Sequence, residues 1–209
     1  MVISEIPIRM TLDDFIRNRH WDNVSVIETG LFFKALHATI FRHWNQKRDD
    51  GKIQYYEHPL VVADTLHQLG FDTEVQIAGL LHDVMDDCGM SYTEIRKTFG
   101  VKIADMVESL SKVEGEDYFE LLFSGTKLNF QTVFIRIADR GHNLATIYGI
   151  RSQARQVRYL EETIGPLRET FLKCRQLIPE DYLVCYDELV DKIDQLAKER
   201  LAEIHQKIA

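Results

Sequence analysis

The chain has little of what marks a disulfide-stabilised or membrane-spanning protein. Its 209 residues include only 3 cysteines, at positions too irregular for a disulfide framework or a Cys-x-x-Cys zinc site, and only 4 prolines. No stretch approaches about eighteen uninterrupted apolar residues, and the first residues lack the basic and then apolar regions of a signal peptide. We therefore expect a cytoplasmic protein that is not inserted in a membrane.

Positive charge is also scarce. The sequence has 25 lysines and arginines against 33 aspartates and glutamates, a formal net charge of −8, and no long run of one sign. This balance disfavours binding to the phosphate backbone of DNA, although it is compatible with a local basic pocket. The proportions of 45% hydrophobic and 28% charged residues are those of an ordinary folded globular protein.

The spacing of apolar residues is helical along most of the chain, and no alternating run bounded by hairpin turns is present. We expect an all-α fold in which residues 1–209 form a single domain with a core over about 29–178. A C-terminal amphipathic helix over about 181–207 either docks on this core or forms a homodimer contact. The other helices are expected over about 29–46, 59–70, 73–87, 91–100, 101–113, 129–148 and 151–177.

The segment EVQIAGLLHDVMDDCG carries the clearest chemistry. On a helical wheel His82, Asp83, Asp86 and Asp87 share one side, together with Gly79, where another group can approach closely. A solvated helix face is the common explanation of such a cluster. However, neighbouring aspartates repel one another, and two lie near the expected C-terminal end of the helix, where the helix dipole disfavours negative charge. A bound cation relieves this strain, and imidazole with carboxylate suits manganese, iron or zinc.

Two further segments carry polar residues at suggestive spacing. In VFIRIADRGHNLATIYG, Asp139, Asn143 and Thr146 fall at i, i+4 and i+7 and so share a helix face, although ordinary ion pairing and local hydrogen bonding also explain them. In RHWNQKRDDGKIQYYEHPLVVA, Lys47 and Arg48 offer cations to phosphate groups. His58, just before a proline, is by itself explained as a helix cap or a surface histidine.

In this order the segments resemble the HD superfamily of metal-dependent phosphohydrolases. More closely, they resemble the hydrolase domain of RelA/SpoT-type alarmone enzymes, including the small stand-alone alarmone hydrolases. The resemblance covers about residues 33–170. It rests on HWNQKR at 43–48, YYEHPLVVA at 55–63, LLHD at 80–83 with DD at 86–87, FG at 99–100, and IADRGHNLAT at 137–146.

The resemblance implies an HD-domain helical bundle with a divalent metal, usually manganese. The metal ligands that it implies are His58, His82, Asp83 and Asp139. It further implies that Asp86 and Asp87, where the family usually has Glu and then Asp, orient the attacking water. The nucleotide contacts that it implies are Arg48, Lys47, Asn143, Thr146 and Tyr159.

The implied reaction is hydrolysis of the 3′-pyrophosphate of the guanosine alarmones ppGpp and pppGpp of the stringent response, which gives GDP or GTP and pyrophosphate. The partner is then a phosphorylated purine nucleotide. Three departures concern its recognition: Asp49 replaces a common second cation, and Gly141 and Ala145 replace a leucine and an arginine. Two alternatives therefore stay open. One is a hydrolase of another nucleotide, such as NADPH or an adenosine alarmone, and the other is a catalytically degenerate alarmone-binding regulator.

Overall fold

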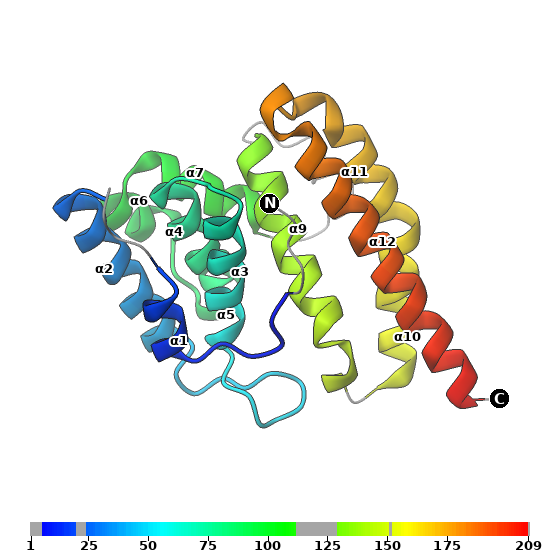
Figure 1. Ribbon diagram of the computed structural model, residues 1–209. Coiled ribbons are helices and arrows are strands. Elements are labelled where there is room, and N and C mark those ends of the chain that lie inside the picture. Colours follow the sequence, from blue (N-terminus) through cyan, green and yellow to red (C-terminus); the bar gives the residue numbers. More distant parts are fainter. Residues whose placement is uncertain (1–5, 20–23, 112–128, 151, 209) are drawn as a thin grey trace.

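The fold is a bundle of helices (Figure 1). The structure is a computed structural model, and it describes residues 6–19, 24–111, 129–150 and 152–208. Within these ranges no strand forms, and only an isolated bridge joins Lys47 to Gln54. The all-α prediction is therefore confirmed. The last two positions of the helix expected over 101–113 lie outside the described residues.

The helices follow one another with short connections. The α-helices are α1 (Leu12–Arg17), α2 (Val26–Arg42), α3 (Glu57–Gln68), α4 (Thr73–Leu81), α5 (Val84–Cys88), α6 (Tyr92–Phe99), α7 (Val101–Leu110), α9 (Phe130–Ala145), α10 (Gln153–Glu162), α11 (Arg168–Cys174) and α12 (Glu180–Ile208). Three short turns of other helix types are η1 (Ile147–Gly149), η2 (Thr163–Leu167) and η3 (Arg175–Leu177).

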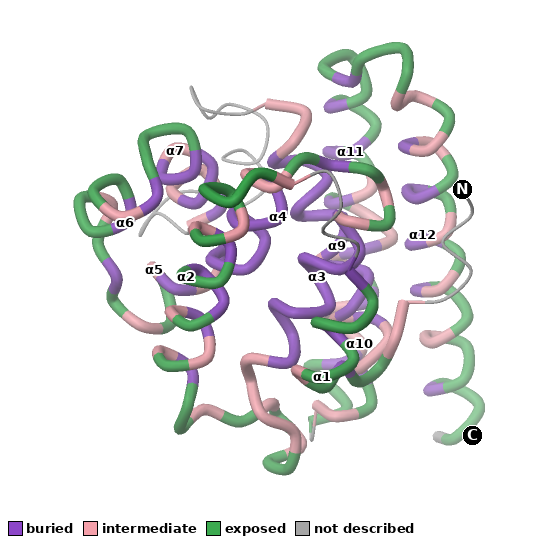
Figure 2. The backbone as a smooth tube through the Cα atoms, turned by 60° about the vertical axis from the view of Figure 1, so that its left-hand side comes forward, coloured by how far each residue is buried: buried purple, intermediate pink, exposed green. Residues whose placement is uncertain are grey.

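Helix α3 lies at the centre of the bundle, and every residue from Glu57 to Leu66 is buried. It packs against α4 and α9, while α2 and α7 pack against α4 (Figures 1 and 2). A helix that is apolar nearly all round is stable only when other helices surround it. The apolar run LVVA of α3 is consistent with this central position, which also buries Asp64 and Thr65.

The C-terminal helix α12 docks on the rest of the bundle. It contacts α9, α10 and α11, and its buried side chains include Tyr186, Val190 and Ile193. Of the two roles that its amphipathic pattern allows, packing on its own core is therefore observed. A homodimer contact of the exposed face stays a prediction, as does the single domain over residues 1–209.

Several helix ends are where local sequence signals place them. Ser91 and Glu94 form a capping box at the start of α6, and Gly100, with φ 94°, ends that helix. Helix α2 begins earlier than expected because Ser25 and Glu28 form a second capping box. Each capping box joins residues only three positions apart, so it can be recognised from the sequence alone.

Two expected helices are interrupted. The helix expected over 73–87 ends at Leu81, because the Nδ1–H of His82 donates to the Gly79 carbonyl, the acceptor that the Asp83 N–H would use in a continuous helix. The helix expected over 151–177 contains a π-helical turn, η2, at Pro166, which has no N–H to continue the hydrogen-bond ladder. Single unbroken helices were wrong predictions in both places.

Gly79 lies where α3 approaches α4 most closely. A Cβ at this position would be 2.6 Å from Leu66 Cδ1 and 3.6 Å from Ala63 Cα. We expect Gly79→Val to lower the free energy of unfolding by about 2 kcal/mol, because added volume strains a packed helix contact. Urea unfolding measures this change. The matched control is Gly30→Val in α2, where nothing lies within 4 Å, and equal effects at both sites would contradict the prediction.

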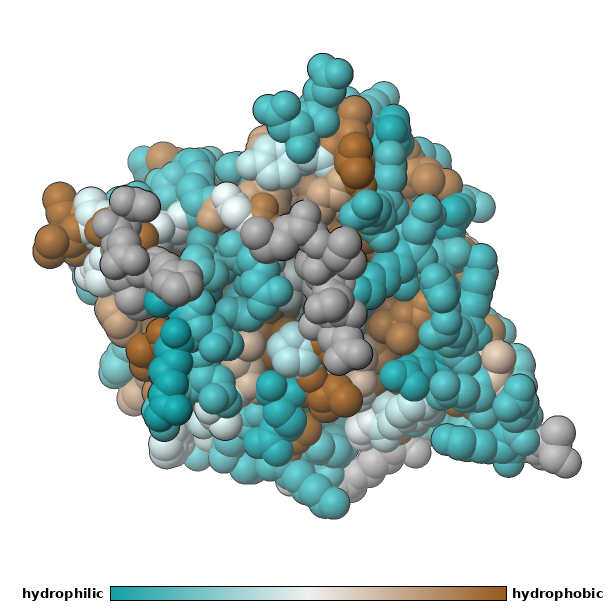
Figure 3. Space-filling model, viewed as in Figure 1, coloured by the Kyte–Doolittle hydropathy of each residue, from teal (hydrophilic) through white to brown (hydrophobic). Residues whose placement is uncertain are grey.

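The face of the molecule in Figure 3 is dominated by polar side chains, and its apolar areas are small and separate. Among the described residues, no helix combines the length and the apolar character needed to cross a bilayer. This finding agrees with the absence of a long apolar stretch in the sequence.

Candidate metal centre

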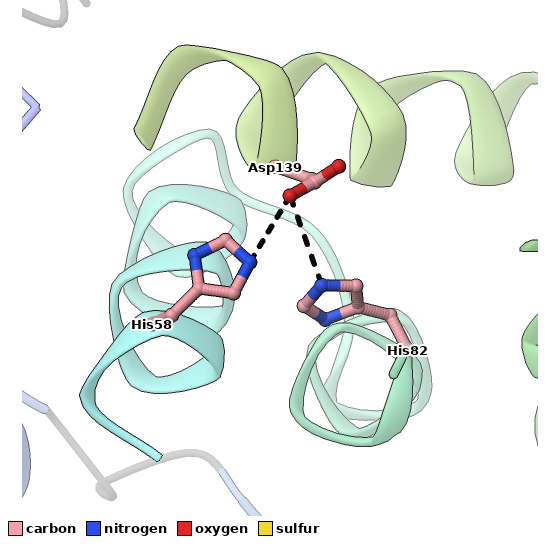
Figure 4. A group of neighbouring side chains, drawn as sticks. All are labelled: His58, His82 and Asp139. Atoms are coloured by element: carbon pink, nitrogen blue, oxygen red, sulfur yellow. Dashed lines mark ion pairs between the residues drawn. The ribbon is translucent and has the colours of Figure 1, made fainter. Parts of the chain in front are cut away.

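Two histidines and two aspartates from three parts of the bundle meet at one point. His58 lies in the first turn of α3, His82 and Asp83 lie between α4 and α5, and Asp139 lies in α9. The Asp139 Oδ1 atom is 3.0 Å from His58 Nε2 and 3.9 Å from His82 Nε2 (Figure 4). The Asp83 Oδ2 atom is 2.9 Å from His82 Nε2 and 3.7 Å from His58 Nε2. All four side chains that the resemblance implies as ligands are therefore brought together.

The ring of His82 is oriented to offer an electron pair to this centre. Its Nδ1–H donates to the Gly79 carbonyl at 2.8 Å, so the Nε2 atom carries the lone pair in the neutral ring. Within the described residues this buried Nε2 has no hydrogen-bond partner, although two carboxylates face it. A buried lone pair opposite carboxylates is unfavourable without a cation between them. The donor set of imidazole and carboxylate fits a divalent metal ion.

The charges of the centre also call for a cation. Burial lowers the pKa of His82, but the charges of Asp83 and Asp139 and the hydrogen bonds of the ring together outweigh burial and raise the pKa to about 9. Burial raises the pKa of Asp83, but the charges of the two histidines and the hydrogen bonds from His82 and Tyr55 together leave that pKa well below its usual range. Burial also lowers the pKa of His58, which keeps that ring neutral. Without metal, a proton on His82 thus supplies the missing positive charge.

A row of hydrogen bonds holds Asp139 in place. Asn143 Nδ2 donates to Asp139 Oδ1 at 2.6 Å. Arg48 Nη2 donates to Asn143 Oδ1 at 2.7 Å and to Thr146 Oγ1 at 3.1 Å. The shared helix face expected for Asp139, Asn143 and Thr146 is therefore observed, and Arg48 joins it from the loop after α2.

Tyr55 also belongs to the centre, although the sequence did not single it out as a site residue. Its hydroxyl donates to Asp83 Oδ2 at 2.7 Å, and burial raises the pKa of Tyr55, which keeps the hydroxyl protonated as a donor. Tyr55 lies in the turn just before α3, so helical spacing could not have identified it; the available signal was its place beside His58 in the segment YYEHP.

Asp86 and Asp87 are exposed on α5 and line the same cavity as the four converging side chains, a space of about 430 Å³. Because the chain breaks at His82, both acids lie in the first turn of the short helix α5. Because α5 ends at Cys88, both acids also lie within its last turn, as expected. Their mutual repulsion is the stronger argument for a nearby cation, because the dipole of so short a helix is small.

A second cavity of about 480 Å³ adjoins the first, and both are lined by Tyr55, His58, Asn143 and Tyr159. The other residues implied as nucleotide contacts, Lys47, Arg48 and Thr146, line this second cavity. Asp49, which departs from the family pattern, also lines the second cavity, and its Oδ2 atom is 3.8 Å from Arg155 Nη2. The first cavity thus holds the histidine and aspartate centre and is also lined by Arg136 and Arg140, whereas Lys47 and Arg48 line the neighbouring cavity.

Comparisons with known proteins agree with this arrangement. Among curated relatives, the guanosine-3′,5′-bis(diphosphate) 3′-pyrophosphohydrolase of Aquifex aeolicus (strain VF5) is 34% identical over 123 residues, which are 55% of this chain and 17% of the relative. The protein of the same name from Spiroplasma citri is 29% identical over 194 residues, 84% of this chain and 26% of the relative. The chain thus spans about a quarter or less of the length of these relatives.

The fold has a counterpart among solved structures. A metazoan orthologue of SpoT, described as hydrolysing ppGpp, superposes with a TM-score of 0.65 at 22% identity, over 81% of this chain and 95% of that one. At this identity the likeness establishes the fold. The family described as "HD domain" matches residues 35–165. With its all-helical bundle and a buried histidine and aspartate centre suited to a divalent metal ion, the chain belongs to the HD-domain family.

Proposed function

We propose that this protein hydrolyses the 3′-pyrophosphate of the guanosine alarmones ppGpp and pppGpp and releases pyrophosphate with GDP or GTP. The observation that carries the proposal is the buried centre of His58, His82, Asp83 and Asp139 at the junction of two cavities. The relatives from Aquifex aeolicus and Spiroplasma citri, which are named for this reaction, support the choice of substrate.

The metal in this proposal is Mn²⁺, held by the two imidazole Nε2 atoms and the carboxylates of Asp83 and Asp139. The unpartnered Nε2 of His82 is the structural support for such an ion. When bound, it supplies Lewis acidity and lowers the pKa of a coordinated water. Tyr55 and Asn143 orient the two carboxylates through their hydrogen bonds to Asp83 and Asp139, and such orientation of ligands commonly governs metal affinity.

Asp86 and Asp87 orient the attacking water and accept its proton in this mechanism. Both carboxylates are exposed in the cavity of the centre, where they are within the space open to water. A general base must be able to reach the water from which it takes a proton. The short helix α5 presents both acids directly after Asp83, so two members of the centre, His82 and Asp83, are continuous in sequence with the base.

The nucleotide occupies the second cavity, and its phosphates face the cations there. Arg48 uses Nη2 for its bonds to Asn143 and Thr146, which leaves Nη1 and Nε as donors for phosphate oxygens. Lys47 adds a positive charge at the exposed edge of this cavity, and Tyr159 forms part of the wall between the two cavities. These cations offset the net charge of −8, which by itself repels a polyphosphate.

A second candidate substrate is supported by the pair of Asp49 and Arg155. Because Asp49 lies 3.8 Å from Arg155, part of the positive charge of the nucleotide cavity is neutralised within the protein. A nucleotide with fewer phosphates, such as NADPH, would then replace the guanosine alarmone as substrate. The metal centre and the hydrolytic mechanism would be the same.

One assay separates these candidates. The purified protein, loaded with Mn²⁺, is incubated with ppGpp, NADPH and an adenosine alarmone, and the products are identified by chromatography. We expect GDP and pyrophosphate from ppGpp, and loss of turnover after removal of the metal by a chelator. If only NADPH or only the adenosine alarmone is hydrolysed, that nucleotide is the substrate and the proposal of ppGpp is wrong. Binding of ppGpp without turnover of any of the three would indicate a regulator.

Metal affinity is expected to rise about tenfold for each pH unit between about pH 7 and pH 9, because a divalent ion must displace the His82 proton. The pKa of His82, about 9, lies above that of an unfolded histidine. This proton therefore stabilises the metal-free fold fully below about pH 6.5, and its contribution disappears as pH rises through about 9. Chelator competition at several pH values measures the affinity, and a flat profile would contradict the prediction.

The cytoplasmic location and the absence of a DNA partner stay predictions from composition. Both rest on the scarcity of positive charge and of apolar stretches in the sequence. A homodimer stays a prediction as well, and size-exclusion chromatography with light scattering tests it directly.

A further inference from the structure

His142 packs directly behind the centre, on the side of His58 away from Asp139. The two rings are nearly parallel and meet edge to edge, with centroids 4.9 Å apart, an interplanar angle of 19° and the two Nδ1 atoms 2.6 Å apart. His58 is 1% and His142 is 2% exposed, so water does not take the place of either partner. At this distance one Nδ1 atom must carry a proton and the other must accept it.

The N-terminal segment, residues 6–10, determines which ring donates. The Ile8 carbonyl oxygen is 3.5 Å from His142 Nε2, and a carbonyl can only accept a hydrogen bond. His142 therefore carries its proton on Nε2 and accepts on Nδ1. His58 must then donate from Nδ1, which leaves the lone pair of His58 on Nε2, the atom 3.0 Å from Asp139 Oδ1.

We propose that His142 is a positioning residue which, together with the Ile8 carbonyl, holds His58 in the metal-binding tautomer. The inference rests on the proposed metal site. In the other tautomer, a proton on His58 Nε2 would donate to Asp139 Oδ1 and would have to leave before a metal could bind. His142 Nδ1 accepts a hydrogen bond only from a proton on His58 Nδ1. It therefore favours the tautomer with the proton on Nδ1 over the competing tautomer with the proton on Nε2.

Two contacts hold the N-terminal segment, residues 6–10, beside His142. Arg9 donates from Nε and Nη2 to the two carboxylate oxygens of Glu57 at 2.7 and 2.9 Å, and Glu57 precedes His58 in the buried helix α3. The Ile6 side chain lies against Gly141, where a Cβ would overlap it. Figure 1 shows the same dark blue segment running from α1 across to α9.

Gly141 is one of the positions where this chain departs from the family pattern. A leucine there would occupy the place of Ile6, so the glycine makes room for the N-terminal segment beside His142. The family resemblance places this substitution among the residues that concern nucleotide recognition. In the structure, Gly141 instead makes room for the segment that contacts His142, the neighbour of the metal ligand His58. Residues 6–10, which are more than forty positions before His58 in the sequence, therefore lie close to His58 in the structure.

The first test compares His142→Phe, which keeps an aromatic ring but removes the acceptor, with His142→Gln, whose amide oxygen can accept from His58 Nδ1. We expect His142→Phe to weaken Mn²⁺ binding about 10- to 100-fold in chelator competition, and His142→Gln to restore most of it. The matched control is His37→Phe on the exposed face of α2, with wild-type affinity expected. Equal affinity of His142→Phe and wild type would overturn the inference.

The second readout needs neither metal nor turnover. Nitrogen-15 NMR of metal-free, histidine-labelled protein reports which ring nitrogen of His58 is protonated. We expect the Nδ1–H tautomer in the wild type and in His142→Gln, and a shift to the Nε2–H tautomer in His142→Phe. An unchanged tautomer in folded His142→Phe would overturn the inference even if the protein hydrolyses ppGpp. Conversely, a wild type with the expected tautomer but no turnover of ppGpp would overturn the proposed function alone.

The third variant tests the part played by the N-terminal segment. Gly141→Leu is expected to displace Ile6, to move the Ile8 carbonyl and to weaken Mn²⁺ binding in the same direction as His142→Phe. Adding Ile6→Ala provides room for the leucine and is expected to recover part of the affinity. Gly141→Leu with wild-type affinity and tautomer would show that the segment plays no part, and so would contradict the role of the Ile8 carbonyl.

Discussion

Replacing Asp139 by alanine is expected to abolish stoichiometric metal binding and to lower ppGpp turnover by about 10³-fold or more, a loss on the order of 4 kcal/mol of transition-state stabilisation. The reason is its place in the centre. Its Oδ1 atom lies 3.0 Å from His58 Nε2 and 3.9 Å from His82 Nε2, and it alone approaches the centre from α9. Without this carboxylate, the two imidazoles and Asp83 offer an incomplete set of ligands.

Two controls separate the charge of Asp139 from its packing. Asp139→Asn keeps the size of the side chain and an acceptor for the Asn143 amide, yet it lacks the negative charge, so we expect a loss of metal nearly as large as for alanine. Asp13→Asn, the same change on the exposed face of α1, is expected to have no effect. Elemental analysis and turnover are measured together with thermal unfolding. A folded Asp139→Ala protein that retains metal and activity within threefold would contradict the assignment.

Replacing Asp86 by alanine is expected to lower turnover by about 10²- to 10⁴-fold while metal content stays at the wild-type level. Asp86 lines the cavity of the centre but is not one of the four converging side chains. The loss should therefore appear in kcat and leave metal affinity unchanged, the opposite of the pattern expected for Asp139→Ala. This contrast distinguishes a residue that acts on water from a residue that holds the ion.

The length of the carboxylate at position 86 provides a second comparison. The family usually has glutamate there, and moving a catalytic group by about an ångström can change a rate substantially. We expect Asp86→Glu to turn over ppGpp at least as fast as the wild type. Asp87→Ala is the neighbouring control, because both acids lie in the first turn of α5. If Asp86→Ala is fully active and Asp87→Ala is inactive, the general base is Asp87 and not Asp86.

Much of the helical architecture follows from signals that act over a few residues. The capping box of Ser91 and Glu94 is complete within one turn, and the apolar spacing after Pro59 predicted the helix that α3 forms. The same local reasoning failed at His82, because the bond from its ring to the Gly79 carbonyl ends α4 in the middle of a helical pattern. That break makes adjacent residues, His82 and Asp83, point into one centre.

The sequence by itself therefore determined the all-helical class, some of the helix ends and the residue types suited to a divalent metal. Only the tertiary structure decided that His58 and Asp139 meet, that Tyr55 bonds to Asp83, and that the Ile8 carbonyl lies beside His142. The physical reason is the range of the interactions. Helix spacing and caps depend on neighbours three or four positions away, whereas the contact of His58 with His142 joins residues 84 positions apart and exists only after α3 has packed against α9.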